Sequence, residues 1–160
     1  MSQIGDLIIR KAQPSKLILK AEADNADAQY NLGCWYENGQ DYIAALFWYI
    51  KAVKQGHANA KIKLIRMAEQ GSAYAQNSLG NCYYYGHGVE QNNKEAFKWF
   101  KKAAEQNNGI AQRNLGNCYV LGAGVPKDFE KAKMWHDKAK ENGEEYNKEL
   151  IQKMAEAFNP

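Results

Sequence analysis

Proline and cysteine are scarce in this chain of 160 residues, and neither sign of charge is in large excess. Only three prolines occur, and Pro126 and Pro160 fall in a loop and at the end, so long spans remain open to helix. The three cysteines are too few, and odd in number, for a disulfide framework. We therefore expect free thiols in a reducing compartment.

Long apolar runs are also absent, and none approaches the roughly 20 residues that cross a bilayer. The net charge of +3 is small and scattered, unlike the clustered basic residues of a nucleic-acid or membrane protein. The N-terminal stretch MSQIGDLIIRKAQP has a short apolar core that precedes most of its positive charge, which does not match a secretory signal. We expect a cytoplasmic protein with no nucleic-acid or membrane partner, unless a presequence has been removed.

A repeat of 36 residues is what the sequence does contain. The segment AQNSLGNCYYYGHGV from Ala75 returns as AQRNLGNCYVLGAGV from Ala111, and Trp99 returns as Trp135 at the same offset. An earlier copy, AQYNLGCWYENG, begins at Ala28 and has a shorter loop. Each copy holds two apolar stripes with helical spacing, which predicts a pair of helices. A pair this small cannot bury its apolar face alone, so the copies must stack.

The repeats divide the chain into six segments. We expect degenerate capping helices over 1–26, repeats over 27–56, 72–107 and 108–143, a single-helix insert or degenerate repeat over 57–71, and a C-terminal capping helix over 144–160. The unpaired helix of the insert breaks the two-helix alternation, so we expect it to bend the superhelix. Second helices and the insert are predicted to end at Gly56, Gly71, Gly109 and Gly143.

Two glycine-rich loops follow the first helices of the last two repeats. A phosphate-binding loop would lie between a strand and a helix, often with Lys and then Ser or Thr after it. Here a predicted helix precedes each loop, and no such pair follows. We interpret the loops as turns in which Gly86 and Gly88 permit positive φ, while Val89 or Val125 fills the gap between helices.

Residues suited to catalysis or metal binding do not form a recognisable constellation. Cys82 and Cys118 occupy the same repeat position on helices expected to pack roughly 8–10 Å apart, whereas a disulfide needs Cα atoms within about 7 Å. The histidines His57, His87 and His136 fall in different repeats without metal-ligand spacing. No nucleophile motif is present. We expect buried or half-buried thiols and no catalytic residue, metal or cofactor.

One pattern of small, apolar and aromatic residues runs through the repeats. In the second repeat it stands as Ala75, Leu79, Gly80, Tyr83, Gly86, Gly88, Val89, Ala96, Trp99, Phe100 and Ala103. The pattern resembles the Sel-1-like repeat family over 72–143 and, less completely, over 27–56. This resemblance implies an all-α fold: a right-handed α-solenoid of antiparallel helix pairs, similar to tetratricopeptide repeats. It also implies adaptor roles between proteins, mostly in bacteria and in eukaryotic quality-control complexes. His136 departs from the pattern, because the other copies have Tyr49 and Phe100 there, and we expect a more exposed last pair.

The resemblance also implies that the first helices line a concave groove, as in tetratricopeptide-like solenoids. Polar residues recur at matched positions on the face of these helices opposite the core. The candidate partner-binding residues are Tyr30, Asn31, Asn77, Asn81, Tyr84, Arg113, Asn114 and Asn117. Asparagine offers a donor and an acceptor to a peptide backbone, and Arg113 can pair with a carboxylate. The other interpretation is that asparagine is only a common polar surface residue.

These observations predict a module that binds another protein or peptide in the groove. It would act as an adaptor in a bacterial regulatory complex or as a toxin-immunity protein. Two alternatives stay open: a cell-wall or β-lactam hydrolase, which only cysteine-rich relatives suggest, and a binder of single-stranded RNA, which the weak net charge opposes. The sequence identifies neither the partner nor the oligomeric state.

Overall fold

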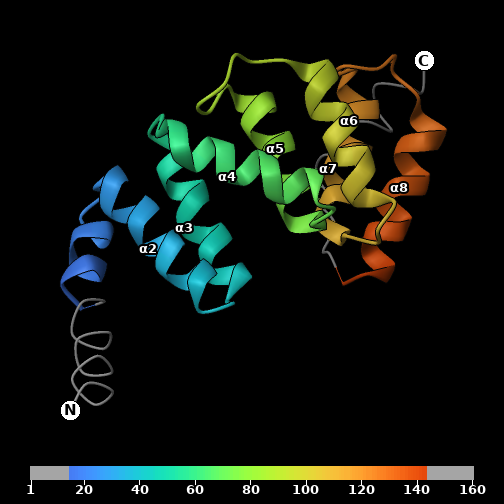
Figure 1. The fold of residues 1–160 in the computed structure, drawn as a ribbon. Coiled ribbons are helices and arrows are strands. Elements are labelled where there is room, and N and C mark those ends of the chain that lie inside the picture. The colour runs from blue at the N-terminus through green and yellow to red at the C-terminus, as the bar shows by residue number, and fades with distance from the viewer. Residues whose placement is uncertain (1–14, 144–160) are drawn as a thin grey trace, which may run out of the picture.

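The computed structural model describes residues 15–143, and within them it contains helices and turns but no strand. Residues 15–22 are helical and precede α2 (Ala26–Asn38), α3 (Tyr42–Lys54), α4 (Ala58–Glu69), α5 (Ala73–Tyr85), α6 (Asn93–Ala104), α7 (Gly109–Leu121) and α8 (Phe129–Glu141) (Figure 1). The all-α expectation is confirmed. The predicted C-terminal cap, 144–160, and the first part of the predicted N-terminal cap, 1–14, lie outside the described residues.

Every labelled helix begins at a residue whose side chain accepts a backbone hydrogen bond from the first turn. These N-caps are Asn25, Asp41, His57, Ser72, Asn92, Asn108 and Asp128. The side chain satisfies one of the free N–H groups at the helix start. Local sequence therefore determines where each helix starts before any packing is considered.

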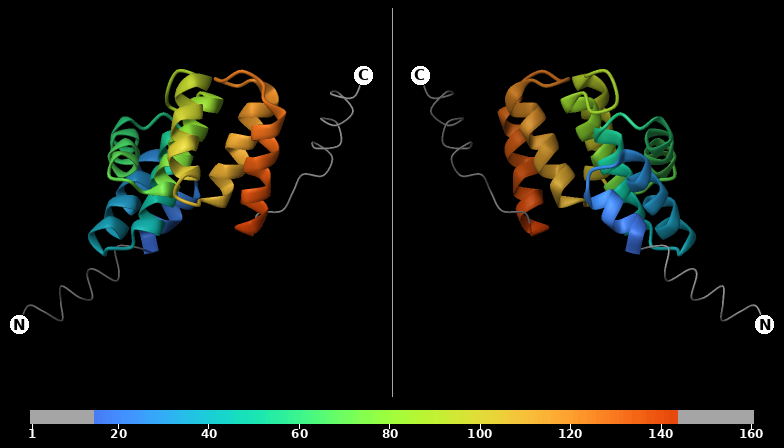
Figure 2. Two further views of the ribbon diagram at one scale, coloured as in Figure 1. Left: turned by 90° about the vertical axis from the view of Figure 1, so that its right-hand side faces the viewer. Right: turned by 90° about the vertical axis from the view of Figure 1, so that its left-hand side faces the viewer.

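Helices α2 and α3, α5 and α6, and α7 and α8 pack as pairs, and α2 and α8 lie at opposite ends of the stack (Figure 2). Each pair is held close by a glycine on its first helix that lies against a ring on its second: Gly33 against Tyr49, Gly80 against Phe100, and Gly116 against His136. A Cβ at Gly33 or Gly80 would lie 2.5 or 2.6 Å from the ring. The glycines are therefore needed for the helix axes to approach.

His136 is buried, and the expectation of a more exposed last pair was wrong at this position. Its ring packs on Gly116 as Phe100 packs on Gly80, and only 6% of its surface is exposed. Its Nε2 lies 3.0 Å from Oδ1 of Asn117, which satisfies the polar edge of the ring. Burial lowers the pKa of His136 below its usual 6.5, because the charged form is poorly solvated there.

A buried glutamine on each first helix connects three helices. The Nε2 groups of Gln29, Gln76 and Gln112 donate to the carbonyl oxygens of Ala21, Ala68 and Ala104 on the preceding helices. Their Oε1 atoms accept from Gln55, Gln106 and Asn142, at the ends of their partner helices. Because both ends of each amide are used in a buried site, these bonds fix how neighbouring helices stack.

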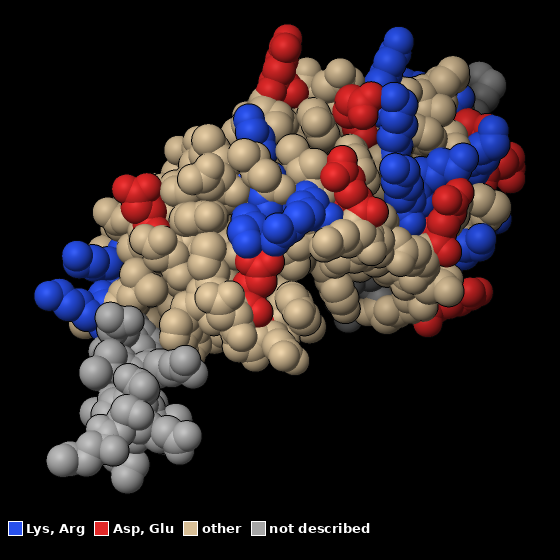
Figure 3. All heavy atoms as spheres, in the orientation of Figure 1, with Lys and Arg blue, Asp and Glu red and all other residues tan. Residues whose placement is uncertain are grey.

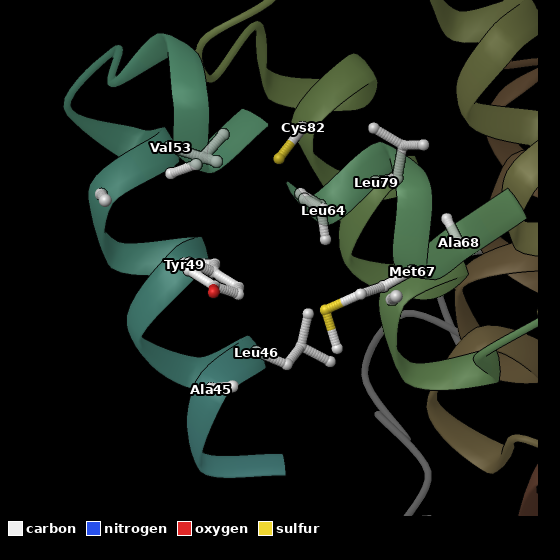
Figure 4. Packing of buried hydrophobic residues seen from close by; sticks show 12 residues of the cluster. Ala45, Leu46, Tyr49, Val53, Leu64, Met67, Ala68, Leu79 and Cys82 are labelled. Atoms are coloured by element: carbon white, nitrogen blue, oxygen red, sulfur yellow. The ribbon is translucent and has the colours of Figure 1, made fainter. Parts of the chain in front are cut away.

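Helix α4 stands alone between the pairs. It packs against α3 on one side and α5 on the other, and with neither of these described helices does it make the extensive contact that joins the two helices of a pair. Ala60 and Leu64 match the alanine and leucine near the start of each first helix. The Ala68 carbonyl accepts a hydrogen bond from Gln76, as the carbonyl at the end of a second helix does. Figure 4 shows side chains of α3, α4 and α5 meeting in one core around Tyr49, Leu64 and Leu79. The bend predicted at this helix stays a prediction.

The glycine loops are turns, as predicted. Gly86 has φ 74° and Gly88 has φ 68°, and the corresponding loop glycines of the last repeat are also positive. A Cβ at Gly88 would lie 2.6 Å from the carbonyl oxygen of Val53, so the loop also closes on α3. One predicted helix end was wrong: Gly109 is the first residue of α7, and the left-handed residue after α6 is Asn107, with φ 61°.

Candidate functional site

Three of the predicted groove residues lie together. Asn81, Arg113 and Asn114 line a hollow of about 310 Å³, together with Ile50, Lys54, Ser78, Cys82, Tyr85, His87 and Ile110. We call this the polar hollow. It spans the stripe of α5 that faces solvent, the start of α7 and the C-terminal part of α3. The other five predicted residues do not line it.

The asparagines are partly used for bonds within the stack. Asn114 Nδ2 donates to Oδ1 of Asn77 at 2.9 Å, which joins α7 to α5, and Asn77 is buried. Asn117 lies against His136, as described above. The recurrence of asparagine therefore reflects, in part, the stacking of first helices. Of the predicted ladder of amides, only Asn81 and the exposed part of Asn114 remain at the polar hollow.

The two predicted tyrosines serve packing. The Tyr30 ring stacks on His57, with centroids 4.6 Å apart and an angle of 22°. Tyr84 meets Tyr85 edge-on, with centroids 4.9 Å apart, and burial raises the pKa of Tyr84. Asn31 is exposed on α2, away from the polar hollow. None of these three residues lines the polar hollow, although Tyr84 packs against Tyr85, which does.

A second hollow of about 660 Å³ adjoins the first and was not predicted. Its lining is mostly apolar: Glu37, Tyr42, Ile43, Leu46, Phe47, Ile50, Met67, Gln70, Gly71, Ser72, Tyr74 and Ser78. We call this the apolar hollow. Ile50 and Ser78 line both hollows, so the two form one groove between α3 and α5, which we call the α3–α5 groove. Figure 3 shows a mostly uncharged face over α2 to α5, interrupted by a group of Lys and Arg beside an acidic group over α4, and further Lys and Arg over α6 and α8.

A sequence signal for the apolar hollow did exist. Aligned on Ala45 and Ala96, the face of α3 carries apolar residues where α6 carries lysines: Ile43, Phe47 and Ile50 against Lys94, Lys98 and Lys101. The repeat comparison concentrated on shared positions, and this difference is found only by asking where the copies diverge. Exposed apolar residues gathered on one face indicate an interaction surface.

Glu37 at the edge of the apolar hollow ties α2 to the lone helix α4. Its carboxylate lies 2.5 Å from Lys63 Nζ and 2.7 Å from Arg66, and it accepts from the Tyr49 hydroxyl at 2.6 Å. Burial alone favours the neutral acid, but the bonds from Lys63 and Tyr49 and the two positive charges outweigh it. The pKa of Glu37 therefore lies below its usual 4.5.

The thiols in the polar hollow and in α7 are not poised for chemistry. Burial raises the pKa of Cys82 to about 11 and that of Cys118 to about 12, so both stay protonated near neutral pH. All three cysteines are free. Within residues 15–143 no cluster of three or more metal-ligating side chains occurs. A search of the same residues finds no helix that could cross a membrane.

Comparison with known proteins assigns the repeats. The family model of the Sel1 repeat matches residues 26–57, 73–108 and 109–144, which leaves α4 outside every match. The crystal structure of a Sel1 repeat protein from Oxalobacter formigenes is similar, with 31% identity, a TM-score of 0.57, and coverage of 88% of this chain and 48% of that one.

A second solved structure is that of c5321, a protective antigen of uropathogenic Escherichia coli strains that displays an SLR fold. It has 33% identity and a TM-score of 0.49, and the match covers 81% of this chain and 33% of that one. The chain thus spans about half and a third of the lengths of these two proteins. No curated protein matches. Because the family model covers more than half of the chain, the chain belongs to the Sel1 repeat family, as its pattern predicted.

Proposed function

We propose that this chain is a protein-binding module that holds a segment of another protein in the α3–α5 groove. Sel1 repeats generally mediate protein–protein interaction. The observation that carries the proposal is the groove itself, in which a polar and an apolar hollow share Ile50 and Ser78. The glycine–ring contacts and buried glutamines keep the helices fixed, so the groove needs little ordering when a partner binds.

The polar hollow supplies the directional contacts. The amides of Asn81 and Asn114 can donate to the carbonyl groups of a bound segment, and the positive charge of Arg113 favours a carboxylate nearby. Tyr85, stacked on His87 with centroids 5.6 Å apart, offers a flat apolar surface beside them. A segment with free backbone oxygens and acidic character fits this combination.

The test begins with capture of partners from the native host, using the tagged chain and mass spectrometry. Affinity for the identified partner is then measured by calorimetry for the wild type and for Asn81→Ala/Arg113→Ala. We expect this variant to bind more than about tenfold more weakly, a loss of about 1.4 kcal/mol. Asn31→Ala, exposed on α2 outside the groove, is the matched control. Unchanged affinity in the double variant would place the partner elsewhere.

The proposal covers both an adaptor that joins two proteins and an immunity-type protein that neutralises one. The number of proteins captured in a stoichiometric complex separates them. The proposed compartment is the cytoplasm, which the three free cysteines support. The family is typically non-catalytic, and assays with β-lactam and cell-wall substrates check this. Turnover lost on one point substitution would favour the hydrolase.

A further inference from the structure

The apolar hollow is a local exception to the repeat pattern. At the positions of Phe47 in α3, the second helices α6 and α8 carry Lys98 and Met134. At the positions of Ile43 they carry Lys94 and Glu130, and all four of these equivalents are exposed. The stacking of helices therefore does not require an apolar residue at either position. Their apolar character in α3 needs a separate reason.

The exposed area is large enough to bind a partner. Ile43 is 75% exposed, Phe47 52%, Tyr42 57% and Tyr74 59%. Together they leave roughly 450 Å² of apolar surface in water, if an aromatic side chain has about 200 Å² in total. A patch of this size on a soluble chain is often functional.

The lone helix α4 explains why a groove exists here. In the complete pairs, the second helix lies directly on its first helix through the glycine–ring contact. Helix α4 has no described mate, and α3 and α5 have few direct contacts with each other. Met67 and Gln70 of α4 line the apolar hollow between them. The space is open along α3, which at 13 residues is about 20 Å long.

Charge decides what kind of segment fits. The ionised groups that line the two hollows are the cations Lys54 and Arg113 and the carboxylate Glu37, which is already paired with Lys63 and Arg66. The C-terminal end of a helix carries partial negative charge and free carbonyl oxygens. The polar hollow, with its amides and the Lys54 and Arg113 cations, is complementary to such an end. The apolar hollow is complementary to an apolar helix stripe.

We propose that the α3–α5 groove receives an amphipathic helix of a partner protein, with its apolar face in the apolar hollow and its C-terminal end at the polar hollow. The helix is about three turns long and carries acidic residues on its polar face. This inference rests on the proposed function and specifies the partner. It uses the recognition mode in which a helix places apolar residues at i, i+3, i+4 and i+7 into a groove.

A second copy of the chain fits less well. A stable interface of standard size buries about 800 Å² on each partner, roughly twice the exposed apolar area of this patch. Obligate dimers need still larger apolar interfaces. One helix face of about three turns matches the area available along α3, which is about 20 Å long.

The probe is a fluorescein-labelled peptide of about 14 residues, with leucines at i, i+3, i+4 and i+7 and glutamates on the other face. Binding is followed by fluorescence anisotropy. We expect wild-type protein to bind it, and Ile43→Lys/Phe47→Lys to bind at least about tenfold more weakly. These two lysines already stand at the matching positions of α6, so the variant is expected to fold, and circular dichroism checks this. Met134→Lys, the same change at the matching position of α8, should bind as the wild type does.

Two further peptides test the chemistry: one with the leucines moved out of register, and one with lysines in place of the glutamates. Both should bind more weakly than the first. Failure of the in-register peptide to bind, or equal binding by Ile43→Lys/Phe47→Lys, overturns the inference. The proposed function then still stands if Asn81→Ala/Arg113→Ala weakens binding of the natural partner. A wild-type dimer that Phe47→Lys dissociates, seen by sedimentation, would identify a second copy as the occupant and also overturn it.

Discussion

In α3, Ile43 and Phe47 lie exposed beside an open groove, whereas in α6 the same positions hold Lys94 and Lys98 on a solvated face. The buried sides of the two helices are alike, since Tyr49 and Phe100 each cover a glycine of the first helix. The N-terminal unit, α2 to α4, and the C-terminal unit, α5 to α8, therefore have similar buried contacts but different surface residues. The difference shows that stacking constrains one face of each helix and leaves the residues of the other face free to vary.

The two units also differ in how their helices are fastened. Tyr49 donates its hydroxyl to Glu37, which in turn pairs with Lys63 and Arg66 of α4. Phe100 has no hydroxyl, so the equivalent ring is held by packing alone. The lone helix α4 is thus joined to the first pair by ionic contacts that the later pairs do not need.

The largest effect on stability is expected from adding a methyl group at the glycine that contacts a ring within a pair. Gly33→Ala would place a methyl group against the Tyr49 ring, which the Glu37 bond prevents from moving away. We expect a loss of about 3 kcal/mol in the free energy of unfolding, against about 2 for Gly80→Ala, where the Phe100 ring is not bonded. Urea unfolding measures both. Gly71→Ala, with φ 97° and no neighbour within 4 Å, is the control and should cost about 1 kcal/mol. Equal losses at Gly33 and Gly71 would contradict the close-approach argument.

The next effect concerns the buried glutamines. Gln76→Ala removes two hydrogen bonds and leaves the Ala68 carbonyl without its side-chain donor. We expect the free energy of unfolding to fall by about 2 kcal/mol. Lys61 stands at the same register in α4 and makes no such bond between helices, so Lys61→Ala should change stability by less than about 0.5 kcal/mol. Similar losses in the two variants would show that the amide does not fasten α5 to α4.

A smaller effect depends on pH. Burial lowers the pKa of His136 below the value of 6.5 that the unfolded chain retains, so the unfolded state binds the proton first on acidification. This part of the stability is complete above pH 6.5 and is lost as the pH falls through the folded pKa. His136→Phe copies Phe100 and should remove that loss. Thermal melts between about pH 7.5 and pH 5 measure it, and parallel curves for variant and wild type would contradict the assignment.

The smallest expected effect is the sharpest test of the comparison between α3 and α6. Lys98→Phe/Lys101→Ile gives α6 the apolar residues that α3 has at the matching positions. This change is combined with Ile43→Lys/Phe47→Lys in one protein. If peptide binding requires the groove as well as the apolar residues, the combined variant should still bind the peptide weakly. Stability should change by less than about 0.5 kcal/mol, because both lysines are exposed. Restored binding in the anisotropy assay would show that apolar exposure alone is sufficient.

The repeat made much of the fold predictable. The spacing of Ala75, Leu79 and Tyr83 indicated a helix, whereas the contact of Gly80 with Phe100 is seen only in the structure. His136 was misjudged because a histidine was taken as a sign of exposure, although its ring fills the same space and Asn117 satisfies its polar edge. Gly109 was misjudged because Asn107 supplies the left-handed residue instead.

The candidate site was less predictable. Asn81, Arg113 and Asn114 were expected to face one groove, and they line one hollow. The repeat pattern did not predict which asparagines would form hydrogen bonds within the chain. Asn77 and Asn114 lie 37 positions apart and meet only when α5 and α7 stack. The sequence comparison also passed over Ile43 and Phe47, because it looked for agreement between copies.

The amino-acid sequence by itself determined the helices, their caps and their pairing within each repeat. These features depend on residues that lie one helical turn apart, or about half a repeat apart, in the sequence. Tertiary structure alone decided which polar groups of the first helices satisfy one another and where a groove stays open. Those outcomes depend on the placement of α4, one helix between two pairs. Helix α4 lies between α3 and α5, and its residues Met67 and Gln70 line the groove between them.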